Sequence, residues 1–227
     1  MPKIHSIETL GALDGPGLRT VIFFQGCVMR CGYCHNADMF DFDGGKEMSA
    51  EEIAAFCARY KSYYGQTGGA TLSGGEPLAQ ADFALEVLNA LKAQGIHTAL
   101  DTSGAVYAPK ALAAADLVLL DIKHTDKDMF LRLTGQPIDN TLKTLSFLQK
   151  KGKPFWVRQV IVQGHNDTVE QVSALKALAE GAQKIQLLPF HSMGAHKWEK
   201  AGLTYPFKNA QPPSEKVMQQ LRNAVLN

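Results

Sequence analysis

The stretch QGCVMRCGYCHN, residues 25–36, contains three of the four cysteines of the chain, Cys27, Cys31 and Cys34. Thiolates are soft ligands that suit zinc or iron–sulfur clusters, and the Cys-x3-Cys-x2-Cys spacing lets one short loop turn its sulfurs toward a common centre. A structural zinc site or an ordinary four-iron cluster is normally closed by a fourth ligand. The remaining cysteine, Cys57, lies well downstream. Three sulfurs would therefore leave one metal position open, where a substrate can bind.

Cysteines also serve as small buried hydrophobes, which is the usual role of a lone one. Three at this spacing, with Gly26 and Gly32 permitting a tight loop, favour metal ligation instead. Cys57 differs, because it lies on one face of an expected helix that opens with the capping box at residues 49–52. The apolar face of that helix is expected to comprise Ile53, Phe56, Cys57, Tyr60 and Tyr64. Core packing is the expected role of Cys57.

Composition favours one α/β domain over residues 1–227, with ordinary globular contents of 45% hydrophobic and 20% charged residues. The formal net charge of +1 implies neither a nucleic acid nor an anionic membrane as partner. The sequence has no apolar run of membrane-spanning length and no signal-peptide layout, so we expect a cytoplasmic protein. Four unevenly spaced cysteines in that reducing compartment do not form a disulfide framework. We expect a monomer.

Apolar runs that alternate with helical patterns predict six parallel strands joined by helices. The strands are expected at residues 20–24, 70–72, 96–100, 117–120, 154–162 and 184–188. Eight such units close a full barrel, so six indicate an incomplete or open one. Ahead of the first strand, residues 14–19 read Asp-Gly-Pro-Gly-Leu-Arg, which composition alone assigns to a hairpin turn.

A polar cluster follows almost every expected strand, at the end where ligands bind in parallel α/β folds. These clusters are residues 27–35, 74–76, 101–103, 121–123 and His191. We therefore expect them to meet at one rim of the sheet. The chain would then bring thiols, bare glycine backbone, carboxylates and cationic groups to a single site.

The cysteine loop, with an aromatic residue just before its last cysteine, resembles the cluster loop of radical S-adenosylmethionine (SAM) enzymes. In that superfamily three cysteines bind a [4Fe–4S] cluster whose fourth iron is chelated by SAM. Residues Gly74, Gly75 and Glu76, followed by a proline, resemble the motif that holds the methionyl amine. The carboxylate of Glu76 would suit that role by pairing with the amino group.

Two carboxylates, Asp101 and Asp121, raise a difficulty at a site that must also hold the carboxylate of SAM. Like charges at close quarters either raise a pKa or recruit a cation, here Lys123 or a bound monovalent ion. The alternative is that both are strand-end acids that cap turns. Arg158 lies inside an apolar strand, where it would contact SAM or Asp121, or else reach solvent from an alternating face.

Taken in order, the motifs resemble the family of pyruvate formate-lyase activating enzymes over nearly the whole chain. The motifs are residues 14–19, 23–36, 44–47, 73–76, 100–104, 120–123 and 188–198. The resemblance implies a partial (β/α)6 TIM-type barrel and places Asp14, Gly15 and Arg19 near the incoming peptide loop. It also implies SAM contacts at Tyr33, His35, Gly75, Asp121, Ile122, Lys123 and His191. The two histidines could flank the adenine or the radical carbon, although a solitary histidine is more often structural.

The implied reaction begins when a reduced [4Fe–4S] cluster cleaves SAM into methionine and a 5′-deoxyadenosyl radical. That radical removes a hydrogen atom from the Cα of a specific glycine in pyruvate formate-lyase, and the electron would come from flavodoxin or ferredoxin. Two alternatives stay open. One is a radical SAM enzyme that acts on another glycyl-radical enzyme or on a small molecule. The other is a non-enzymatic iron–sulfur electron-transfer module in which Cys57 completes the site.

Overall fold

Eight strands form one sheet in the order β3-β1-β2-β4-β5-β6-β7-β8 over residues 2–226, the part of the chain that the computed structural model describes. The strands are β1 Lys3–Gly11, β2 Arg19–Phe24, β3 Lys46–Glu47, β4 Gly69–Gly74, β5 Thr98–Thr102, β6 Leu117–Asp121, β7 Phe155–Ile161 and β8 Lys184–Pro189. From β2 through β8 every pairing is parallel. The six parallel strands expected from the sequence are therefore confirmed, as is the partial-barrel fold class.

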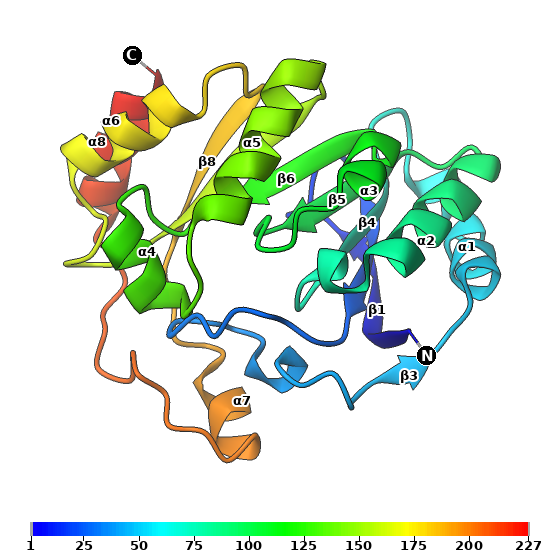
Figure 1. Ribbon diagram of the computed structural model, residues 1–227, viewed down its shortest axis with the longest axis horizontal. Coiled ribbons are helices and arrows are strands. Elements are labelled where there is room, and N and C mark those ends of the chain that lie inside the picture. The colour runs from blue at the N-terminus through cyan, green and yellow to red at the C-terminus, as the bar shows by residue number, and fades with distance from the viewer. Residues whose placement is uncertain (1, 227) are drawn as a thin grey trace.

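Two further strands extend the sheet on its N-terminal side, and the sequence patterns did not predict them. Strand β1 pairs antiparallel with β2, and the short β3 pairs antiparallel with β1. Residues 12–18 join β1 to β2, so the hairpin turn expected from composition is confirmed. Figure 1 shows β1 and β3 on one side of the molecule and β8 on the other, so the sheet does not close on itself.

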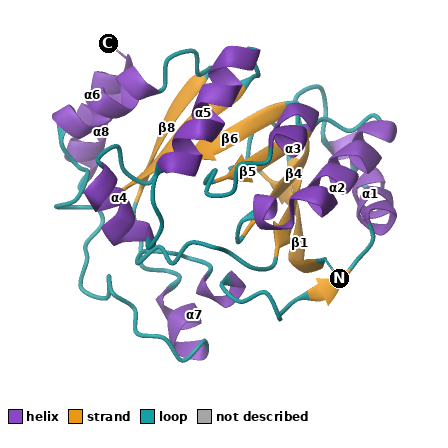
Figure 2. Cartoon of the chain, viewed as in Figure 1, coloured by secondary structure: helices purple, strands orange, loops and turns teal. Residues whose placement is uncertain are grey.

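Most helices lie along the outside of the sheet, as Figure 2 shows. The α-helices are α1 Ala50–Ala58, α2 Ala81–Ala93, α3 Pro109–Ala114, α4 Lys127–Thr134, α5 Asp139–Lys151, α6 Val169–Leu178, α7 Ala195–Lys200 and α8 Glu215–Leu226. Three short 3-10 helices are η1 Ala37–Met39, η2 Lys61–Tyr63 and η3 Pro77–Gln80. No helix in residues 2–226 is both long enough and apolar enough to cross a membrane.

The main core lies between the sheet and the helices. Strand β6, with the sequence LVLLD, is buried along its whole length, as expected of a parallel strand covered on both faces. Inside the curved sheet, Ala99, Leu117 and Leu119 form a smaller apolar cluster with Trp156. This cluster fills the interior near the start of the strands, which leaves the other end free for polar groups.

Three expectations about local structure were wrong. Helix α1 ends at Ala58 rather than running to Tyr64, and the Tyr64 hydroxyl donates a hydrogen bond to the Cys57 carbonyl at 3.0 Å. Strand β5, Thr98–Thr102, begins and ends two residues later than expected, so Asp101 belongs to the strand itself. Helices α4 and α7 were not predicted, since both are short and their packing partners are distant in sequence.

Candidate active site

A cavity of about 590 Å³ opens at the carboxyl ends of the parallel strands. It is lined by all of the clusters that the sequence placed at strand ends. The predicted residues on its wall are Asp14, Cys27, Cys31, Tyr33, Cys34, His35, Gly74, Gly75, Asp101, Asp121, Lys123, Arg158 and His191. Four predicted residues are not on the wall, namely Gly15, Arg19, Glu76 and Ile122.

The cysteine loop begins where β2 ends, and hydrogen bonds to residues 38–41 set its path. Gln25 donates from its side-chain amide to the carbonyls of Asp38 at 3.2 Å and Asp41 at 2.6 Å. The Gly26 amide donates to the Met39 carbonyl at 3.1 Å. Gly26 has φ +92°, and a Cβ there would lie 2.2 Å from the Phe42 ring. The glycine is therefore required both by its backbone conformation and by close packing.

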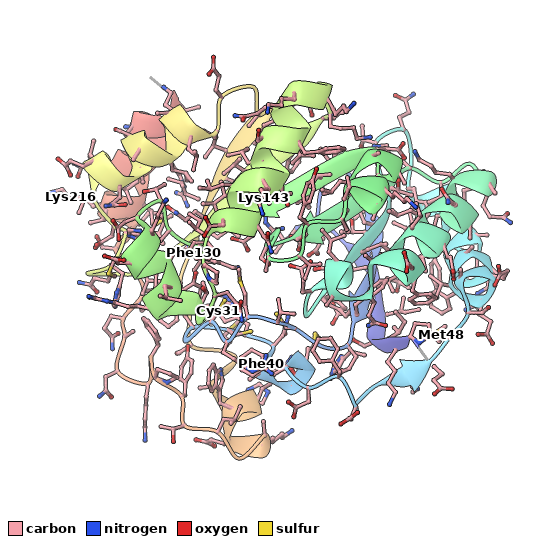
Figure 3. All side chains as sticks on the ribbon, in the orientation of Figure 1. Cys31, Phe40, Met48, Phe130, Lys143 and Lys216 are labelled. Carbon is pink, nitrogen blue, oxygen red and sulfur yellow. The ribbon has the colours of Figure 1, made fainter. Side chains whose placement is uncertain are left out.

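The three thiols of the loop all line the cavity. Cys31 is buried beside Met29 and Phe130, and Figure 3 labels Cys31 and Phe130. Cys27 and Cys34 are half-buried. Within residues 2–226, no three His, Cys, Asp or Glu side chains are placed to hold a single metal ion. Each protein thiolate of a four-iron cluster binds a different iron, so three thiols on one wall suit such a cluster.

Burial keeps the cysteine loop in its thiol form when no metal is bound. It raises the pKa of Cys27 to about 12, with a smaller contribution from the nearby Glu76 carboxylate. Burial also raises the pKa of Cys31 and of Cys34. Metal ligation requires thiolates, so binding must release these protons. The Asn36 amide donates to the Cys34 sulfur at 3.3 Å, a contact that favours the thiolate.

The fourth cysteine is not part of the cavity wall. Cys57 is fully buried in the main core, on α1, as the sequence predicted. Its placement contradicts the alternative in which it completes a protein-ligated centre. The thiol set that faces the cavity therefore consists of three cysteines and leaves one position of a four-iron cluster for another ligand.

Gly74 and Gly75 allow the loop after β4 to pack directly against the cysteine loop. A Cβ on Gly74 would lie 2.4 Å from the Phe24 amide nitrogen, and one on Gly75 would lie 2.2 Å from the Gly26 carbonyl oxygen. The Glu76 amide donates to that same carbonyl at 2.9 Å. A side chain at Gly74 would clash with the end of β2, and one at Gly75 would push the two loops apart.

Glu76 does not present a free carboxylate, contrary to the sequence-based expectation. The side chain is fully buried, and its oxygens accept hydrogen bonds from the Leu78 amide at 3.0 Å and the Thr102 hydroxyl at 2.6 Å. They also accept from the amide of Ser103 at 2.9 Å and from its hydroxyl. Burial raises the pKa of Glu76, against the effect of these hydrogen bonds. Glu76 therefore ties the loop after β4 to the loop after β5.

Ile122 and Arg19 are likewise held away from the cavity. Ile122 is fully buried in the main core. Arg19 is also fully buried and donates to Thr71 Oγ1 at 2.6 Å and to the carbonyls of Ala70 at 2.7 Å and Pro16 at 3.0 Å. Burial lowers the pKa of Arg19 to about 10. In this structure the Arg19 side chain is therefore not exposed at the cavity, and its hydrogen bonds brace the hairpin.

The remainder of the hairpin brings Asp14 to the cavity. Asp14 lines the wall with its neighbour Leu13, and its carbonyl accepts a hydrogen bond from Thr71 at 2.7 Å. Burial raises the pKa of Asp14, and the Asp101 carboxylate raises it further. Gly15 is buried with φ +129°, a conformation that only glycine adopts readily.

Asp101 and Asp121 are balanced by two buried cations. Arg158 Nη2 lies 3.3 Å from Asp101 Oδ2 and 4.0 Å from Asp121 Oδ2, while Lys123 Nζ lies 2.7 Å from Asp121 Oδ2. Only 12% of the Arg158 side chain is exposed, so the alternative in which it reaches solvent is wrong. Burial alone would lower the pKa of Lys123, but Asp121 raises it well above its usual value. Both residues therefore remain cationic.

His35 and His191 stack on each other across the site. Their ring centroids are 3.8 Å apart with an interplanar angle of 19°, and His35 Nε2 lies 2.8 Å from the His191 carbonyl oxygen. Burial lowers the pKa of His35, and the adjacent His191 lowers it further. His35 is therefore neutral near pH 7, and the pair presents flat aromatic surface to the cavity.

Several buried polar atoms at this cavity have no hydrogen-bond partner among the described residues. They are Tyr33 Oη, Asp121 Oδ1, Arg158 Nε and His191 Nδ1. Buried polar groups without partners are costly, so their concentration here indicates a polar ligand. A free carboxylate oxygen suits an ammonium group, and a free guanidinium nitrogen suits a carboxylate. An amino acid moiety with both groups fits this donor set.

The wall also holds residues to which the sequence analysis gave no individual role, namely Met29, Asn36, Ser73, Thr102 and Ser103. Ser73 donates to Asp101 Oδ2 at 2.8 Å, which helps to orient that carboxylate. Met29, Thr102 and Ser103 lie within predicted clusters, and Asn36 and Ser73 lie directly beside one. Proximity to a strand end was the signal that could have identified them.

Comparison with known proteins agrees with this geometry. Residues 21–177 match the family model of the Radical SAM superfamily. The chain is 41% identical to the pyruvate formate-lyase-activating enzyme of Clostridium pasteurianum, over 97% of this chain and 95% of that protein. It is 38% identical to the enzyme of the same name from Staphylococcus epidermidis, over 96% of this chain and 92% of that protein.

Solved structures support the same fold. A domain of the pyruvate-formate lyase-activating enzyme from Bacteroides vulgatus matches with a TM-score of 0.58 and 24% identity, over 70% of this chain and 93% of that one. Streptococcus suis SuiB, bound to its precursor peptide SuiA, matches with a TM-score of 0.71 and 17% identity, over 91% of this chain and 44% of that one. Given the family model and the near full-length identity to curated relatives, this chain belongs to the pyruvate formate-lyase-activating enzyme family of the radical SAM superfamily.

Proposed function

We propose that this chain activates pyruvate formate-lyase by removing a hydrogen atom from the Cα of one glycine in that partner. The observation that carries the proposal is the convergence of three thiols with a paired set of carboxylates and cations on one cavity, in a chain 41% identical to an enzyme of that name. When bound, a reduced [4Fe–4S] cluster and SAM supply the 5′-deoxyadenosyl radical that accepts the hydrogen atom.

The residues of this chain would bind and orient the two reactants. Cys27, Cys31 and Cys34 would hold three irons of the cluster. The free Oδ1 of Asp121 would accept from the amino group of SAM, and the free Nε of Arg158 would donate to its carboxylate. Holding both groups in place costs no reorganisation during the reaction, because the carboxylate–cation network is already formed.

The glycine target suits the geometry of the site. A glycine has no side chain, so its Cα can approach closely a radical carbon held inside a cavity. The hairpin residues Leu13 and Asp14 lie on the wall, where they would face the partner's backbone. The stacked rings of His35 and His191 would exclude water beside the adenine.

The electron must be delivered from outside the site. Over residues 2–226 the only cysteine beyond the cavity is Cys57, too few thiols for a second cluster. We infer flavodoxin or ferredoxin as the donor. A monovalent cation beside Asp101 and Asp121 also stays a prediction, since Arg158 and Lys123 already supply positive charge there.

An anaerobic activation assay tests the proposal. Reconstituted and reduced protein would be mixed with SAM and pyruvate formate-lyase, and a glycyl-radical doublet would be sought by electron paramagnetic resonance. We expect the doublet, and we expect none when the target glycine is changed to alanine. SAM cleavage that produces a doublet only with a different glycyl-radical enzyme would contradict the proposed partner. A cluster spectrum that SAM does not change would contradict the whole mechanism.

A further inference from the structure

The segment after β8 packs over the last part of the cysteine loop. We call residues 190–207 the C-terminal clamp; it includes α7, which lies apart from the other labelled helices in Figure 1. The clamp contacts the loop through buried side chains rather than through the sheet. Phe190, Trp198 and Tyr205 form an apolar cluster with Tyr33 and with other residues of the loop. No strand pairing joins these two segments, so side-chain contacts must hold them together.

Trp198 makes the most specific of these contacts. Its indole Nε1 donates to the Cys34 carbonyl at 2.8 Å, and only 5% of the residue is exposed. The indole ring also meets Phe40 edge-on, with centroids 5.3 Å apart and planes at 89° (Figure 3 labels Phe40 beside α7). The single hydrogen-bond donor of this side chain is therefore used to fix the backbone of the third cysteine.

Lys197 fixes the residues that follow that cysteine. Its ammonium group donates to Asn36 Oδ1 at 2.9 Å and lies 3.2 Å from Asp38 Oδ2. The backbone N–H of Asn36 in turn donates a hydrogen bond to the Cys34 sulfur. Neighbouring side chains of α7 thus hold the Cys34 carbonyl and the residue whose amide faces the Cys34 sulfur. An amide directed at a ligating sulfur also tunes the potential of an iron–sulfur cluster.

Close backbone packing supports both contacts. A Cβ on Gly194 would lie 2.5 Å from the His35 Cα, so the clamp touches the loop backbone directly. A Cβ on Gly32 would lie 2.8 Å from the Phe207 ring, which packs edge-on against Tyr33. The loop from Gly32 to Asn36 therefore rests on the clamp along its length.

We propose that Trp198 and Lys197 are positioning residues, which hold Cys34 and the Asn36 amide in the geometry that the cluster requires. The inference rests on the proposed function only in assigning the three thiols to a cluster. Without these two contacts the loop would keep its residues but lose its preorganisation. The third cysteine would then bind iron less tightly, although it lies far in sequence from the residues that were changed.

The test compares Trp198→Phe and Lys197→Met with two matched controls. Trp198→Phe removes the donor and keeps an aromatic ring, while Lys197→Met removes the charge and keeps the aliphatic stem. The controls are Trp156→Phe, inside the sheet, and Lys200→Met, exposed on the same helix. Hydrogen exchange of residues 32–39 would be measured in metal-free protein, and iron release to a chelator in anaerobically reconstituted protein.

We expect both quantities to rise roughly fivefold in each test variant, the effect of losing about one hydrogen bond, and to stay unchanged in the controls. Unchanged exchange and iron release in both test variants would overturn the proposal. So would equal increases in the controls. Faster hydrogen exchange and faster iron release in both test variants than in wild type would support the proposal, whether or not a glycyl radical forms. The absence of a glycyl radical would contradict the proposed function alone.

Discussion

At the scale of single residues, identical side chains have different roles because their surroundings differ. Cys34 lines the cavity and receives an amide hydrogen bond at its sulfur, whereas Cys57 packs among apolar side chains of the main core. Only the first environment combines access to a ligand with stabilisation of a thiolate. The residue type alone does not separate the two roles, but the surrounding pattern does.

The first prediction compares these two cysteines. Cys57→Ala should keep the reconstituted cluster and its response to SAM, and should lose about 1 kcal/mol of unfolding free energy from the small cavity created. Cys34→Ala should lose the cluster, because one iron loses its ligand. Absorbance in the visible charge-transfer band of the cluster measures cluster content, and denaturant unfolding measures the change in unfolding free energy. Loss of the cluster in Cys57→Ala would contradict the three-thiol assignment.

The second prediction concerns the pH dependence of stability. Burial raises the pKa of Cys57 to about 12, above its value of about 8.5 in an unfolded chain. The folded state therefore holds the proton more tightly, and this stabilisation is present below pH 8.5 and lost as pH rises toward 12. Between these values wild type should lose up to about 1.4 kcal/mol per pH unit more than Cys57→Ala.

Chemical denaturation of the metal-free proteins at several pH values checks this difference. A Cys57→Ser variant is not a suitable control, since a buried hydroxyl adds its own cost. If the unfolding free energies of wild type and Cys57→Ala fell in parallel between pH 8.5 and 10.5, the Cys57 thiol would not contribute to the pH dependence of stability.

At the scale of elements, the loops that follow neighbouring strands are fitted to each other. Gly75 packs on Gly26, and Glu76 receives hydrogen bonds from Thr102 at the end of β5 and from Ser103 directly after it. Three consecutive loops are thereby joined before any ligand binds. The Gly-Gly-Glu motif contributes compact backbone and a buried link, rather than a free carboxylate.

The third prediction is that Gly75→Ala disrupts this fit. The added Cβ would lie 2.2 Å from the Gly26 carbonyl oxygen, which is backbone and cannot swing away, so we expect a loss of about 3 kcal/mol. Gly164→Ala is the control: it has φ +76° but no heavy atom within 4 Å, and should cost only about 1 kcal/mol. Denaturant unfolding compares them, and equal losses would show that backbone strain, not loop packing, matters.

At the scale of the whole molecule, the charge network joins three adjacent parallel strands through residues that lie far apart in the chain. Asp101 comes from β5, Asp121 from β6 and Arg158 from β7, and their side chains meet inside the curved sheet. Strand register decides this, since Asp121 pairs directly with Arg158 across the β6–β7 ladder. The network therefore forms only when these three strands are correctly paired.

The fourth prediction is that Arg158→Met destabilises the protein by about 3 kcal/mol near pH 7, because two buried carboxylates lose a cation. Arg158→Lys should recover part of this loss, since an ammonium group can reach one carboxylate. SAM binding to the reconstituted protein should weaken more in Arg158→Met than in Arg158→Lys. The change that SAM causes in the cluster spectrum measures this binding. Equal stability of wild type and Arg158→Met would show that the network adds nothing.

The sequence by itself determined the alternation of strands and helices, the three-cysteine loop and the side of the sheet where polar residues gather. These features depend on local periodicity and spacing, which neighbouring residues encode. Only the tertiary structure showed that Glu76 and Arg19 are internal braces, that Arg158 pairs first with Asp101, and that Trp198 supports Cys34. Those contacts join residues far apart in the chain, and strand register and sheet curvature set them, so no local pattern contains them.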